Sequence, residues 1–526
     1  MKTKSKPTKG QPQHTLAAPV GPPILPYETD EDLSPSCRVD ELVFAELAQR
    51  NIAPMHLCSD AVFLRRAYID VIGTLPTSTE ARNFLQDSSP TKRANLIETL
   101  FDREEYSQYW ATKWCDLLRV KSEFPVNLWP LASQAYHRWI RTAIRDNMPY
   151  DQFVRSLLTA SGSNFRDPAV NFYRSIPGRK PESIARFVAL IFMGERAEHW
   201  PSGRLQSMAP FFSQIGFKGT AEWKEEIVLW DPVKKAAWAS GEAGPSADFP
   251  DGEQAVFQSN RDPREVFADW RTAPSNPWMA QNIVNRIWSW LLGRGIIHEP
   301  DDIRPDNPPS NAPLLAYLER VLVASRFDTR SVYRVILNSK VYRLSSVTKT
   351  VDPAAESLFA CYPIRRLDAE VLIDAIDQIS GTTEVYSSEI PEPFTFLPPD
   401  QRAIDLPDGS ITSTFLEMFG RPTRDTGLES ERNNRLTSSQ RLHLLNSSHI
   451  RRKIDQIPAN LGLMQGAKPA TQILDELYLA ILSRFPTDDE RKVVLDYMQR
   501  PDANKRDTVI DVAWAAINSA EFLFRH

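Results

Sequence analysis

YSQYWATKWCDLLRV (residues 106–120) repeats apolar side chains every three or four positions, with Trp110 and Trp114 one helical turn apart. This spacing places them along one face of an α-helix. The same pattern recurs in three earlier segments, DELVFAELAQRN (40–51), SDAVFLRRAYIDVIG (59–73) and TKRANLIETLF (91–101). The sequence therefore predicts a mainly α, multi-helical protein.

Proline is common in this chain and strand signals are few. The 526 residues include 41 Pro and 20 Gly, which favours short helices that end at proline and are joined by stiff loops. The clearest strand signal is EEIVLWDPVKKAAW (225–238), where two short extended runs flank Asp231-Pro232. It predicts a small β-hairpin. Segment 382–413 is rich in Pro and has little periodicity, which predicts a long ordered loop.

Composition divides the chain into four parts. Residues 1–36 are polar and Pro-rich, and we expect them to form a disordered tail. Residues 240–260 are polar with Gly and Pro, which is typical of a linker. We therefore expect two helical domains, 37–239 and 261–526, which suits the length of the chain.

Charge and hydropathy exclude several classes of protein. The net charge is −5 with both signs mixed along the chain, whereas a nucleic-acid-binding protein needs a dense basic face. The longest apolar run, FVALIFMG (187–194), is too short to span a bilayer. The basic N-terminus is not followed by an apolar stretch, so we expect no signal peptide in this chain. The four cysteines form no C-x-x-C pair.

Two segments near either end of the chain align without a gap. They are FLRRAYIDVIGTLPTSTEARNFL (63–85) and ILDELYLAILSRFPTDDERKVVL (473–495). Each pattern predicts a helix, a proline break and a T-x-x-E capping box that begins the next helix. An old duplication or a helix connector used twice explains the match, and neither indicates a function.

Longer motifs carry a family resemblance. The first half contains YHRWIRTAIRDNMPYDQFVRSLLTASG (136–162) and MAPFFSQIGFKGT (208–220), and the second contains PWMAQNIVNRIWSWLLGRGIIHEPDDIRPDNPPSN (277–311) and FGRPTRDTGLESERNN (419–434). In this order they resemble the tandem domains of unknown function found in planctomycete proteins and described as cytochrome-c-associated. The resemblance covers nearly everything after residue 40. It implies an exported protein, often beside haem-bearing or carbohydrate-related modules, with no established activity.

The chain departs from the family pattern at two places. Relatives resemble FLGVRLQCAQCHDHPF where this chain has FMGERAEHWPSGR (192–204), and CECER where it has LESER (428–432). Haem cannot be attached covalently without the two thiols of C-x-x-C-H. We therefore expect a variant that lacks the haem motif and holds no cofactor. The remaining candidate metal ligands are Glu195 and His199, one helical turn apart.

FGRPTRDTGLESERNNRLTSSQRLHLLNS (419–447) concentrates opposed charges before a predicted helix. In one interpretation its charged side chains bind an anionic or hydroxyl-rich ligand, and Glu429 or Glu431 is the acid/base. In the other, which we favour, an ion-pair network pins the segment to the core, and its arginines are neutralised by acids of the same segment. The ligand-binding candidates in the segment are Arg421, Arg424, Asp425 and Arg432.

Two further places carry candidate residues. His443, on the helix after the charged segment, could orient a carboxylate and is a third catalytic candidate. HEPDDIRPDNPPSN (298–311) has enough acids to hold calcium, but its spacing is not that of an EF-hand and Arg304 adds a positive charge. A loop packed on the preceding helix is the favoured interpretation, with Asp302 and Arg304 kept as ligand-binding candidates.

Two functions follow as hypotheses. The first is a haem-less binding or interaction protein of the bacterial cell envelope, whose partner is a polysaccharide or another envelope protein. The second is a hydrolase acting on polysaccharide, which requires two carboxylates about 5–10 Å apart across an open cleft. Common catalytic signatures are absent, so the sequence leaves open whether the protein is an enzyme. Location is open too, because the resemblance implies export and the N-terminus does not.

Overall fold

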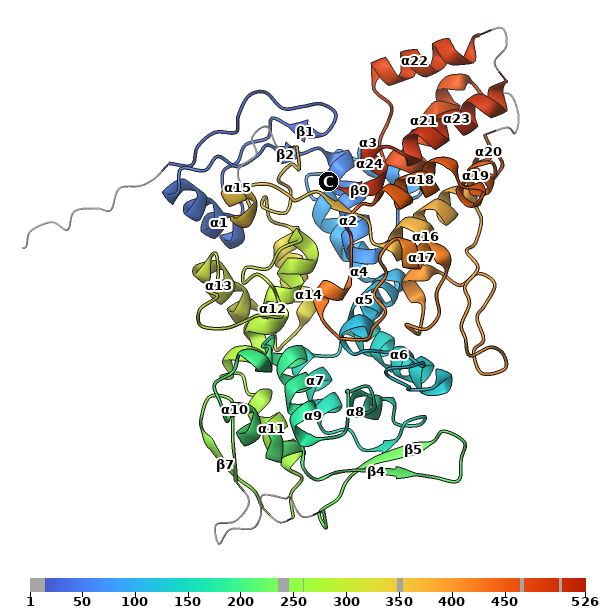
Figure 1. The fold of residues 1–526 in the computed structure, drawn as a ribbon. Coiled ribbons are helices and arrows are strands. Elements are labelled where there is room, and N and C mark those ends of the chain that lie inside the picture. Colours follow the sequence, from blue (N-terminus) through green and yellow to red (C-terminus); the bar gives the residue numbers. More distant parts are fainter. Residues whose placement is uncertain (1–14, 235–245, 259, 348–352, 464–467, 501–503) are drawn as a thin grey trace, which may run out of the picture.

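The computed structural model describes residues 15–234, 246–258, 260–347, 353–463, 468–500 and 504–526 (Figure 1). About 51% of the model is helical and 6% lies in strands, which confirms a mainly α protein. The helices of the first half are α1 (Arg38–Gln49), α2 (Asp60–Ile72), α3 (Ser78–Gln86), α4 (Lys92–Phe101), α5 (Glu104–Leu117), α6 (Pro130–Arg145), α7 (Tyr150–Leu158), α8 (Asn171–Arg174), α9 (Pro181–Val188) and α10 (Arg204–Met208).

The second half is also helical. Its helices are α11 (Pro263–Arg271), α12 (Pro277–Leu292), α13 (Ala312–Ala324), α14 (Thr329–Leu337), α15 (Pro353–Ser357), α16 (Ala369–Ser380), α17 (Thr414–Met418), α18 (Ser438–Asn446), α19 (Ser448–Ile454), α20 (Ile457–Asn460), α21 (Ala470–Leu482), α22 (Asp488–Met498), α23 (Lys505–Ile517) and α24 (Ala520–Leu523). The tryptophan stripe of α5 is buried against this half, because the rings of Trp110 and Trp290 lie 5.3 Å apart.

The strands are short and antiparallel. They are β1 (Glu28–Thr29), β2 (Leu57–Cys58), β3 (Gly162–Ser163), β4 (Ile215–Gly219), β5 (Glu226–Trp230), β6 (Ser246–Asp248), β7 (Gln254–Val256), β8 (Arg365–Arg366) and β9 (Phe524–Arg525). They pair as β1–β2, β3–β5–β4, β6–β7 and β8–β9.

The predicted hairpin at 225–238 lies earlier in the chain than expected. Its first run forms β5, but β5 pairs with the preceding strand β4, with Ile215 opposite Trp230. Asp231-Pro232 therefore follows the end of β5 and is not the hairpin turn. Most of the second run, from residue 235, lies outside the described residues.

The expected tail and linker both contain structure. Residues 1–14 lie outside the described residues, but beyond them β1 pairs with β2 and Tyr27 donates a hydrogen bond to Glu521 (3.1 Å). In the expected linker, β6 pairs with β7, and the ring of Phe249 stacks on Trp270 at 4.9 Å. Residues 240–245 and 259 of that linker lie outside the description.

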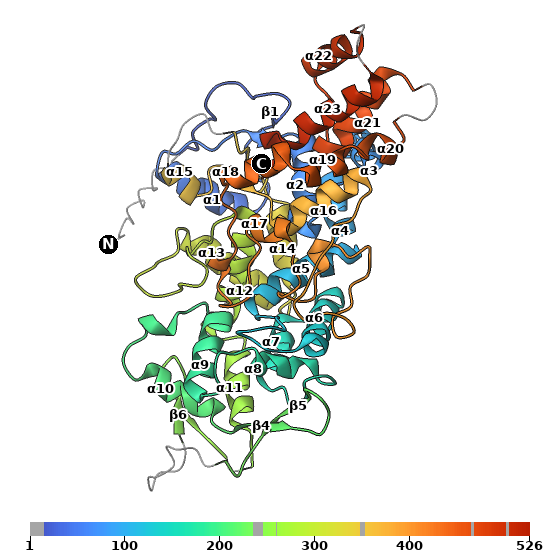
Figure 2. The same cartoon turned by 45° about the vertical axis from the view of Figure 1, so that its right-hand side comes forward.

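The two halves of the chain share one core. Figures 1 and 2 show α21–α23 beside α3 at one end of the molecule and α7–α11 at the other, with α5, α12 and α16 between them. Arg65 of α2 is buried and donates to the carbonyls of Ile481 (2.8 Å) and Phe522 (2.9 Å). The domain boundary at 240–260 remains a prediction along the sequence, and it does not separate two bodies in space.

Both predicted capping boxes are present. Thr77 Oγ1 accepts from the Glu80 backbone N–H (3.2 Å), and the Glu80 carboxylate accepts from the Thr77 N–H (2.8 Å). Thr487 and Glu490 repeat this exchange at 2.8 and 3.2 Å. The T-x-x-E pattern therefore located the start of α3 and of α22.

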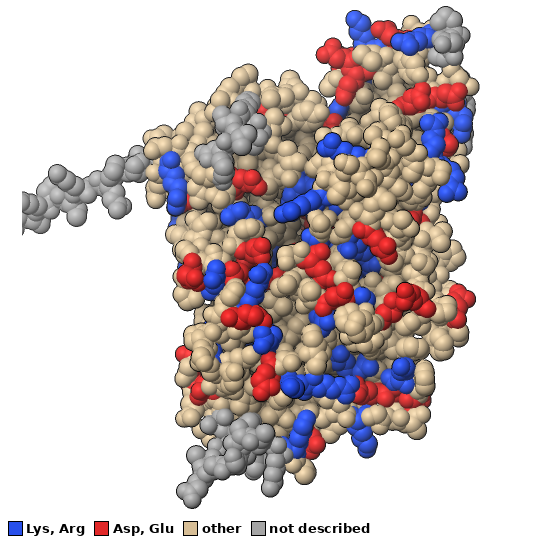
Figure 3. All heavy atoms as spheres, viewed as in Figure 1, with Lys and Arg blue, Asp and Glu red and all other residues tan. Residues whose placement is uncertain are grey.

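The surface carries charges of both signs. Figure 3 shows basic and acidic side chains interspersed over one face, without a large area of one sign. Among the described helices, none has the length and apolar character that a membrane crossing requires.

Candidate functional site

The charged segment 419–437 is a loop that leaves α17 and returns to begin α18. Close packing at Gly420 makes the return possible, because a Cβ atom there would lie 1.9 Å from the carbonyl oxygen of Asn433. Gly420 also has a φ of 78°, which a residue with a side chain adopts only under strain. Thr437 then caps α18 in a capping box with Gln440.

Two arginines of the loop meet on one aspartate of α5. Arg424 Nε lies 3.0 Å from Asp116 Oδ1, and Arg432 Nη2 lies 2.6 Å from Asp116 Oδ2. Arg432 also donates to both carboxylate oxygens of Glu370 on α16, at 2.7 and 3.0 Å. Burial alone would raise the pKa of Glu370, but Arg432 and Arg421 outweigh it and lower that pKa to about 2.

A second buried carboxylate extends this network toward the C-terminal strand. Asp368 accepts from Lys113 Nζ (2.9 Å), Arg525 Nη2 (3.0 Å) and Asn434 Nδ2 (2.7 Å). Burial opposes the ionisation of Asp368. The positive charges of Lys113, Arg432 and Arg525 outweigh this and hold the pKa of Asp368 well below its usual range. Arg525 also pairs with Asp70 of α2 at 2.5 Å. We call the following residues the charge clamp: Lys113, Asp116, Asp368, Glu370, Arg424, Arg432 and Arg525.

The clamp corrects one expectation. The arginines are buried in an ion-pair network, but their acidic partners Asp116 and Glu370 come from α5 and α16 and not from the same segment. Arg421 is also buried; it donates to the carbonyls of Asp408 (3.1 Å) and Ile411. Burial lowers the pKa of Arg421 to about 10. Arg421 and Arg424 are therefore buried inside the protein and bound there to carbonyl and carboxylate oxygens.

Asp425 and Glu431 serve the loop itself. Asp425 pairs with Lys121 at 2.8 Å. The Glu431 carboxylate accepts from the hydroxyls of Thr423 and Thr426 (2.6 Å each) and from two backbone N–H groups of the loop. Burial raises the pKa of Glu431, but these hydrogen bonds outweigh it and lower the pKa. Glu431 thus stabilises the turn of its own loop. It is not among the residues that line the cavity beside the clamp.

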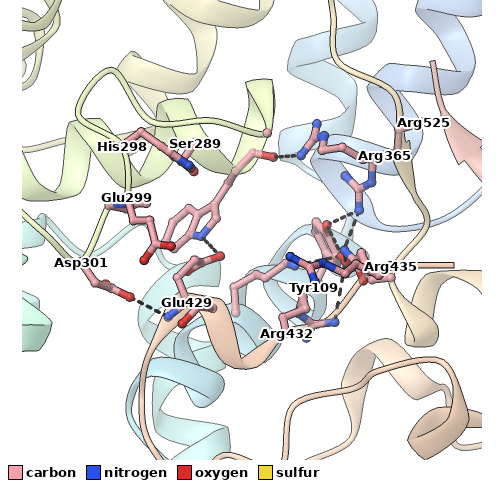
Figure 4. A pocket seen from close by; sticks show the side chains of 17 residues that line it. Tyr109, Ser289, His298, Glu299, Asp301, Arg365, Glu429, Arg432, Arg435 and Arg525 are labelled. Carbon is pink, nitrogen blue, oxygen red and sulfur yellow. Dashed lines mark hydrogen bonds and ion pairs between the residues drawn. The ribbon is translucent and has the colours of Figure 1, made fainter. Parts of the chain in front are cut away.

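A cavity of about 470 Å³ lies beside the clamp. Side chains from α5, α12, the loop after α12, the 365–368 region, the 429–435 segment and Arg525 line it. Figure 4 shows Glu299, Asp301 and Glu429 on one side of this space, and Arg365, Arg435 and Arg525 on the other. The cavity therefore presents acids on one wall and guanidinium groups on the opposite wall.

Glu429 is the acidic candidate that faces the cavity. Its Oε1 accepts from the indole N–H of Trp290 at 3.0 Å, and its backbone N–H donates to Asp301 Oδ2 at 2.7 Å. Burial raises the pKa of Glu429; Lys113 opposes this and Asp301 adds to it. Asp301 itself is buried and paired with Arg286 (2.8 Å). Within the described part of the chain, Glu429 is therefore a carboxylate with no arginine bound to it.

Two guanidinium groups of the opposite wall have no carboxylate partner within the described residues. The side chain of Arg435 is exposed and makes no hydrogen bond or ion pair there. Arg365 donates to the carbonyls of Trp290 (3.2 Å) and Leu291 (2.7 Å) at the end of α12, and to the Tyr362 hydroxyl (2.9 Å). These cations leave charge in the cavity that an anion can neutralise.

The loop after α12 holds the other ligand-binding candidates away from this wall. Asp302 pairs with His199 Nδ1 (3.2 Å) and with Arg304 (3.2 Å), and Arg304 also pairs with Asp306 (3.3 Å). Asp302 and Arg304 therefore neutralise each other, and neither lines the cavity.

The structure does not bring Glu195 and His199 together as metal ligands. The buried carboxylate of Glu195 accepts from the indole N–H groups of Trp200 and Trp278 and pairs with Arg204 at 3.2 Å. His199 faces Asp302 instead. No group of three or more His, Cys, Asp or Glu side chains that could hold a metal ion is found among the described residues.

His443 contacts a second histidine and not a carboxylate. Its Nε2 lies 3.2 Å from His449 Nδ1, and His449 Nε2 lies 2.8 Å from Glu384. Burial and the neighbouring His449 lower the pKa of His443. The carboxylate is thus oriented by His449, and His443 lies outside the cavity.

Sequence reasoning missed the acids that hold the arginines. Lys113 and Asp116 share a face of α5 with Tyr109, which they follow by four and seven residues. Charged side chains on a face that is otherwise apolar are the one signal in the sequence for these partners. Asp368 and Glu370 stand at the start of α16, where acids are common for local reasons, so their role left no signal.

Family models match both halves of the chain. The family model described as a protein of unknown function (DUF1549) matches residues 38–196. The family model described as a protein of unknown function (DUF1553) matches residues 263–498. The chain belongs to the family that carries these two domains in tandem. No curated protein and no solved structure matches it.

The tandem domains explain where the cavity lies. Tyr109 and Lys113 come from the part matched by the first model, whereas Trp290, Glu429 and Arg435 come from the part matched by the second. The charge clamp joins the same two parts through Asp116 and Arg432. Both the clamp and the cavity therefore take residues from the two family domains, and Arg525, which belongs to both, follows the second matched range.

Proposed function

We propose that the chain is a binding protein of the cell envelope whose cavity, between the tandem domains, takes a small hydroxyl-rich molecule that carries a carboxylate, sulfate or phosphate group. The envelope location rests on the family resemblance alone. The single observation that carries the ligand chemistry is the unpaired guanidinium of Arg435 beside Arg365.

The acidic wall of the cavity, opposite Arg435, supplies the other contacts to the ligand. Among the residues that the structure describes, Trp290 alone donates to the Glu429 carboxylate, and the remaining lone pairs can accept from ligand hydroxyls. An anionic group at Arg435 and hydroxyls at Glu429 would fix a ligand across the cavity in one orientation. Charge-assisted hydrogen bonds of this kind are the stronger ones in proteins.

The clamp supports a binding role because it keeps the cavity in one shape. Arg432 lines the cavity and is held by Glu370 and Asp116, so this wall is already rigid before a ligand arrives. Preorganised sites lose less entropy on binding.

The polysaccharide hydrolase is the weaker hypothesis on the same geometry. Glu429 has the raised pKa of a general acid, but Glu431 is turned into its own loop. Without a second free carboxylate at a suitable separation, the usual pair of a glycosidase is not assembled from these two residues.

The proposal is tested by calorimetric titration of the protein with D-glucuronate, sulfate and inorganic phosphate, with D-glucose as the neutral probe. We expect glucuronate to bind and glucose to bind at least about tenfold more weakly, because a charged hydrogen bond is worth about 1.5–3 kcal/mol. Arg435→Ala should remove that difference. Arg441→Ala is the matched control, because Arg441 is an exposed arginine of α18 outside the cavity.

Two results would overturn the binding proposal: no anionic probe binds, or Arg435→Ala binds glucuronate as tightly as the unchanged protein. Release of reducing sugar from a polysaccharide, lost in Glu429→Gln without a change in glucuronate affinity, would favour the hydrolase instead.

A further inference from the structure

The hairpin of β4 and β5 lies at one end of the molecule (Figure 1), and its turn carries part of an aromatic cluster with two exposed rings. The ring of Trp129 lies 6.2 Å from Trp223 at an interplanar angle of 84°, and 5.3 Å from Phe394 at 61°. The ammonium group of Lys224 lies 5.0 Å from the Trp129 ring and 5.2 Å from the Trp223 ring. We call Trp129, Trp223, Lys224 and Phe394 the aromatic platform.

Three segments far apart in the sequence build the platform. Trp129 precedes α6, Trp223 and Lys224 form the β4–β5 turn, and Phe394 lies in the long loop between α16 and α17. Glu123 ties the first and third segments together, because its carboxylate accepts from the Ser388 hydroxyl (3.1 Å) and the Glu389 N–H (3.2 Å). The segments that carry Trp129 and Phe394 are therefore tied to each other.

The platform is costly for the folded protein. Trp223 is 68% exposed and Phe394 is 49% exposed, which leaves apolar surface in water. Trp129 and Lys224 also have positive φ angles, 76° and 62°, where a side chain other than glycine is disfavoured. Exposed rings beside strained backbone positions are typical of surfaces that bind something.

We propose that the aromatic platform binds a carbohydrate chain. The C–H face of a pyranose ring packs on the exposed surface of the Trp223 indole, and its hydroxyls hydrogen-bond to the ammonium group of Lys224, which lies over the two indole rings. The charge of Lys224 argues against two other kinds of ligand, a methylated amine and a protein surface. Its charge repels a methylated amine, which aromatic cages otherwise bind. It also makes a poor centre for a protein interface, where lysine is depleted because burying it is costly.

The platform and the cavity are separate sites. No platform residue lines the cavity, so binding at one can be lost while binding at the other is kept. The platform could hold the protein on a polymer while the cavity takes a small molecule.

The test is calorimetric titration of the full chain with three neutral hexasaccharides: cellohexaose, xylohexaose and mannohexaose. We expect at least one to bind, and Trp223→Ala to weaken that binding by about three- to tenfold. Lys224→Gly should weaken it too while the protein keeps or gains thermal stability, because glycine suits the positive φ. Glucuronate binding should not change in either variant.

Val493→Ala is the matched control. Val493 is as exposed as Trp223 (68%) but lies on α22, at the opposite end of the molecule (Figure 1). Its hexasaccharide affinity should equal that of the unchanged protein. The proposal is overturned if none of the three chains binds at millimolar concentration, or if Trp223→Ala and Lys224→Gly bind as tightly as the unchanged protein.

Discussion

Arg432 and Arg435 are three residues apart in one loop, yet they have opposite environments. Arg432 is held by Asp116 and Glu370, whereas Arg435 has no side-chain partner among the described residues. The difference comes from the elements they face. Arg432 meets α5 and α16, which supply carboxylates, and Arg435 faces the cavity. The same residue type is a structural group in one place and a candidate ligand group in the other.

The largest expected effect is the difference in stability between a variant that lacks Arg432 and a variant that lacks Arg435. Arg432→Ala leaves the buried carboxylate of Glu370 without its main cation, while Asp116 keeps Arg424. Breaking such a buried pair costs about 3–5 kcal/mol of unfolding free energy. Arg435→Ala should change it by no more than about 0.5 kcal/mol, as expected for an exposed side chain without partners. Urea denaturation followed by circular dichroism measures both. Equal stability of the two variants would mean that the clamp does not hold the loop.

A second comparison lies on α16, where Glu370 and Asp374 are one turn apart and both buried. Arg432 lowers the pKa of Glu370 to about 2, despite the burial that opposes it. Asp374 accepts from the backbone N–H groups of Ala403 (2.8 Å) and Ile404 (3.1 Å), and Arg402 lies 3.6 Å away. These do not compensate for its burial, which raises the pKa of Asp374 to about 6.

These two shifts predict opposite pH dependences. The folded pKa of Glu370 is depressed, so its stabilisation is complete above its unfolded pKa of about 4.3 and is lost as the pH falls toward about 2. The folded pKa of Asp374 is raised, so its contribution is complete below about pH 4 and is lost as the pH rises through about 6. Each effect is on the order of 3 kcal/mol.

Urea denaturation between pH 2 and pH 7 checks both signs. The unfolding free energy should rise from pH 2 to about 4.5 and then fall toward pH 6. Glu370→Gln should reduce the rise more than the fall, and Asp374→Asn should reduce the fall more than the rise. The explanation fails if both variants keep the profile of the unchanged protein.

The features that could be predicted from the sequence are those that depend on local patterns. The stripe of α5 and the capping boxes at Thr77 and Thr487 depend on neighbours within one or two turns, so they could be recognised directly. The charged loop was recognised as a site of interest for its density of charge, but the partners of Arg432 were not. Asp116 lies 316 residues before Arg432, and only the fold brings the two together.

The hairpin shows the same limit at shorter range. The extended run of β5 was recognised, but its partner was expected after Asp231-Pro232 and lies before it. Periodicity identifies a strand and does not identify which neighbour supplies its hydrogen bonds. The aromatic platform left no sequence signal either, because Trp129 and Phe394 come from loops with no shared pattern.

Glu429 and Glu431 give the finest comparison, because they are two residues apart and differ in the sign of their pKa shift. Burial raises the pKa of Glu429, so its charge destabilises the folded protein at neutral pH. Glu429→Gln should therefore raise the unfolding free energy at pH 7, because it removes the buried charge while the amide oxygen still accepts from Trp290. Below about pH 4 the gain should vanish, since the carboxyl is then protonated in both states.

Glu431→Gln should act in the opposite direction, because an amide has one acceptor oxygen where the carboxylate uses two against four donors of its own loop. A loss of about 1 kcal/mol at pH 7 is expected from the hydrogen bonds that the amide cannot accept. Thermal melts of both variants at pH 7 and pH 4 compare the two directly. If Glu429→Gln destabilises the protein as Glu431→Gln does, Glu429 is a structural carboxylate like its neighbour. The proposal that Glu429 binds ligand hydroxyls would then lose its support.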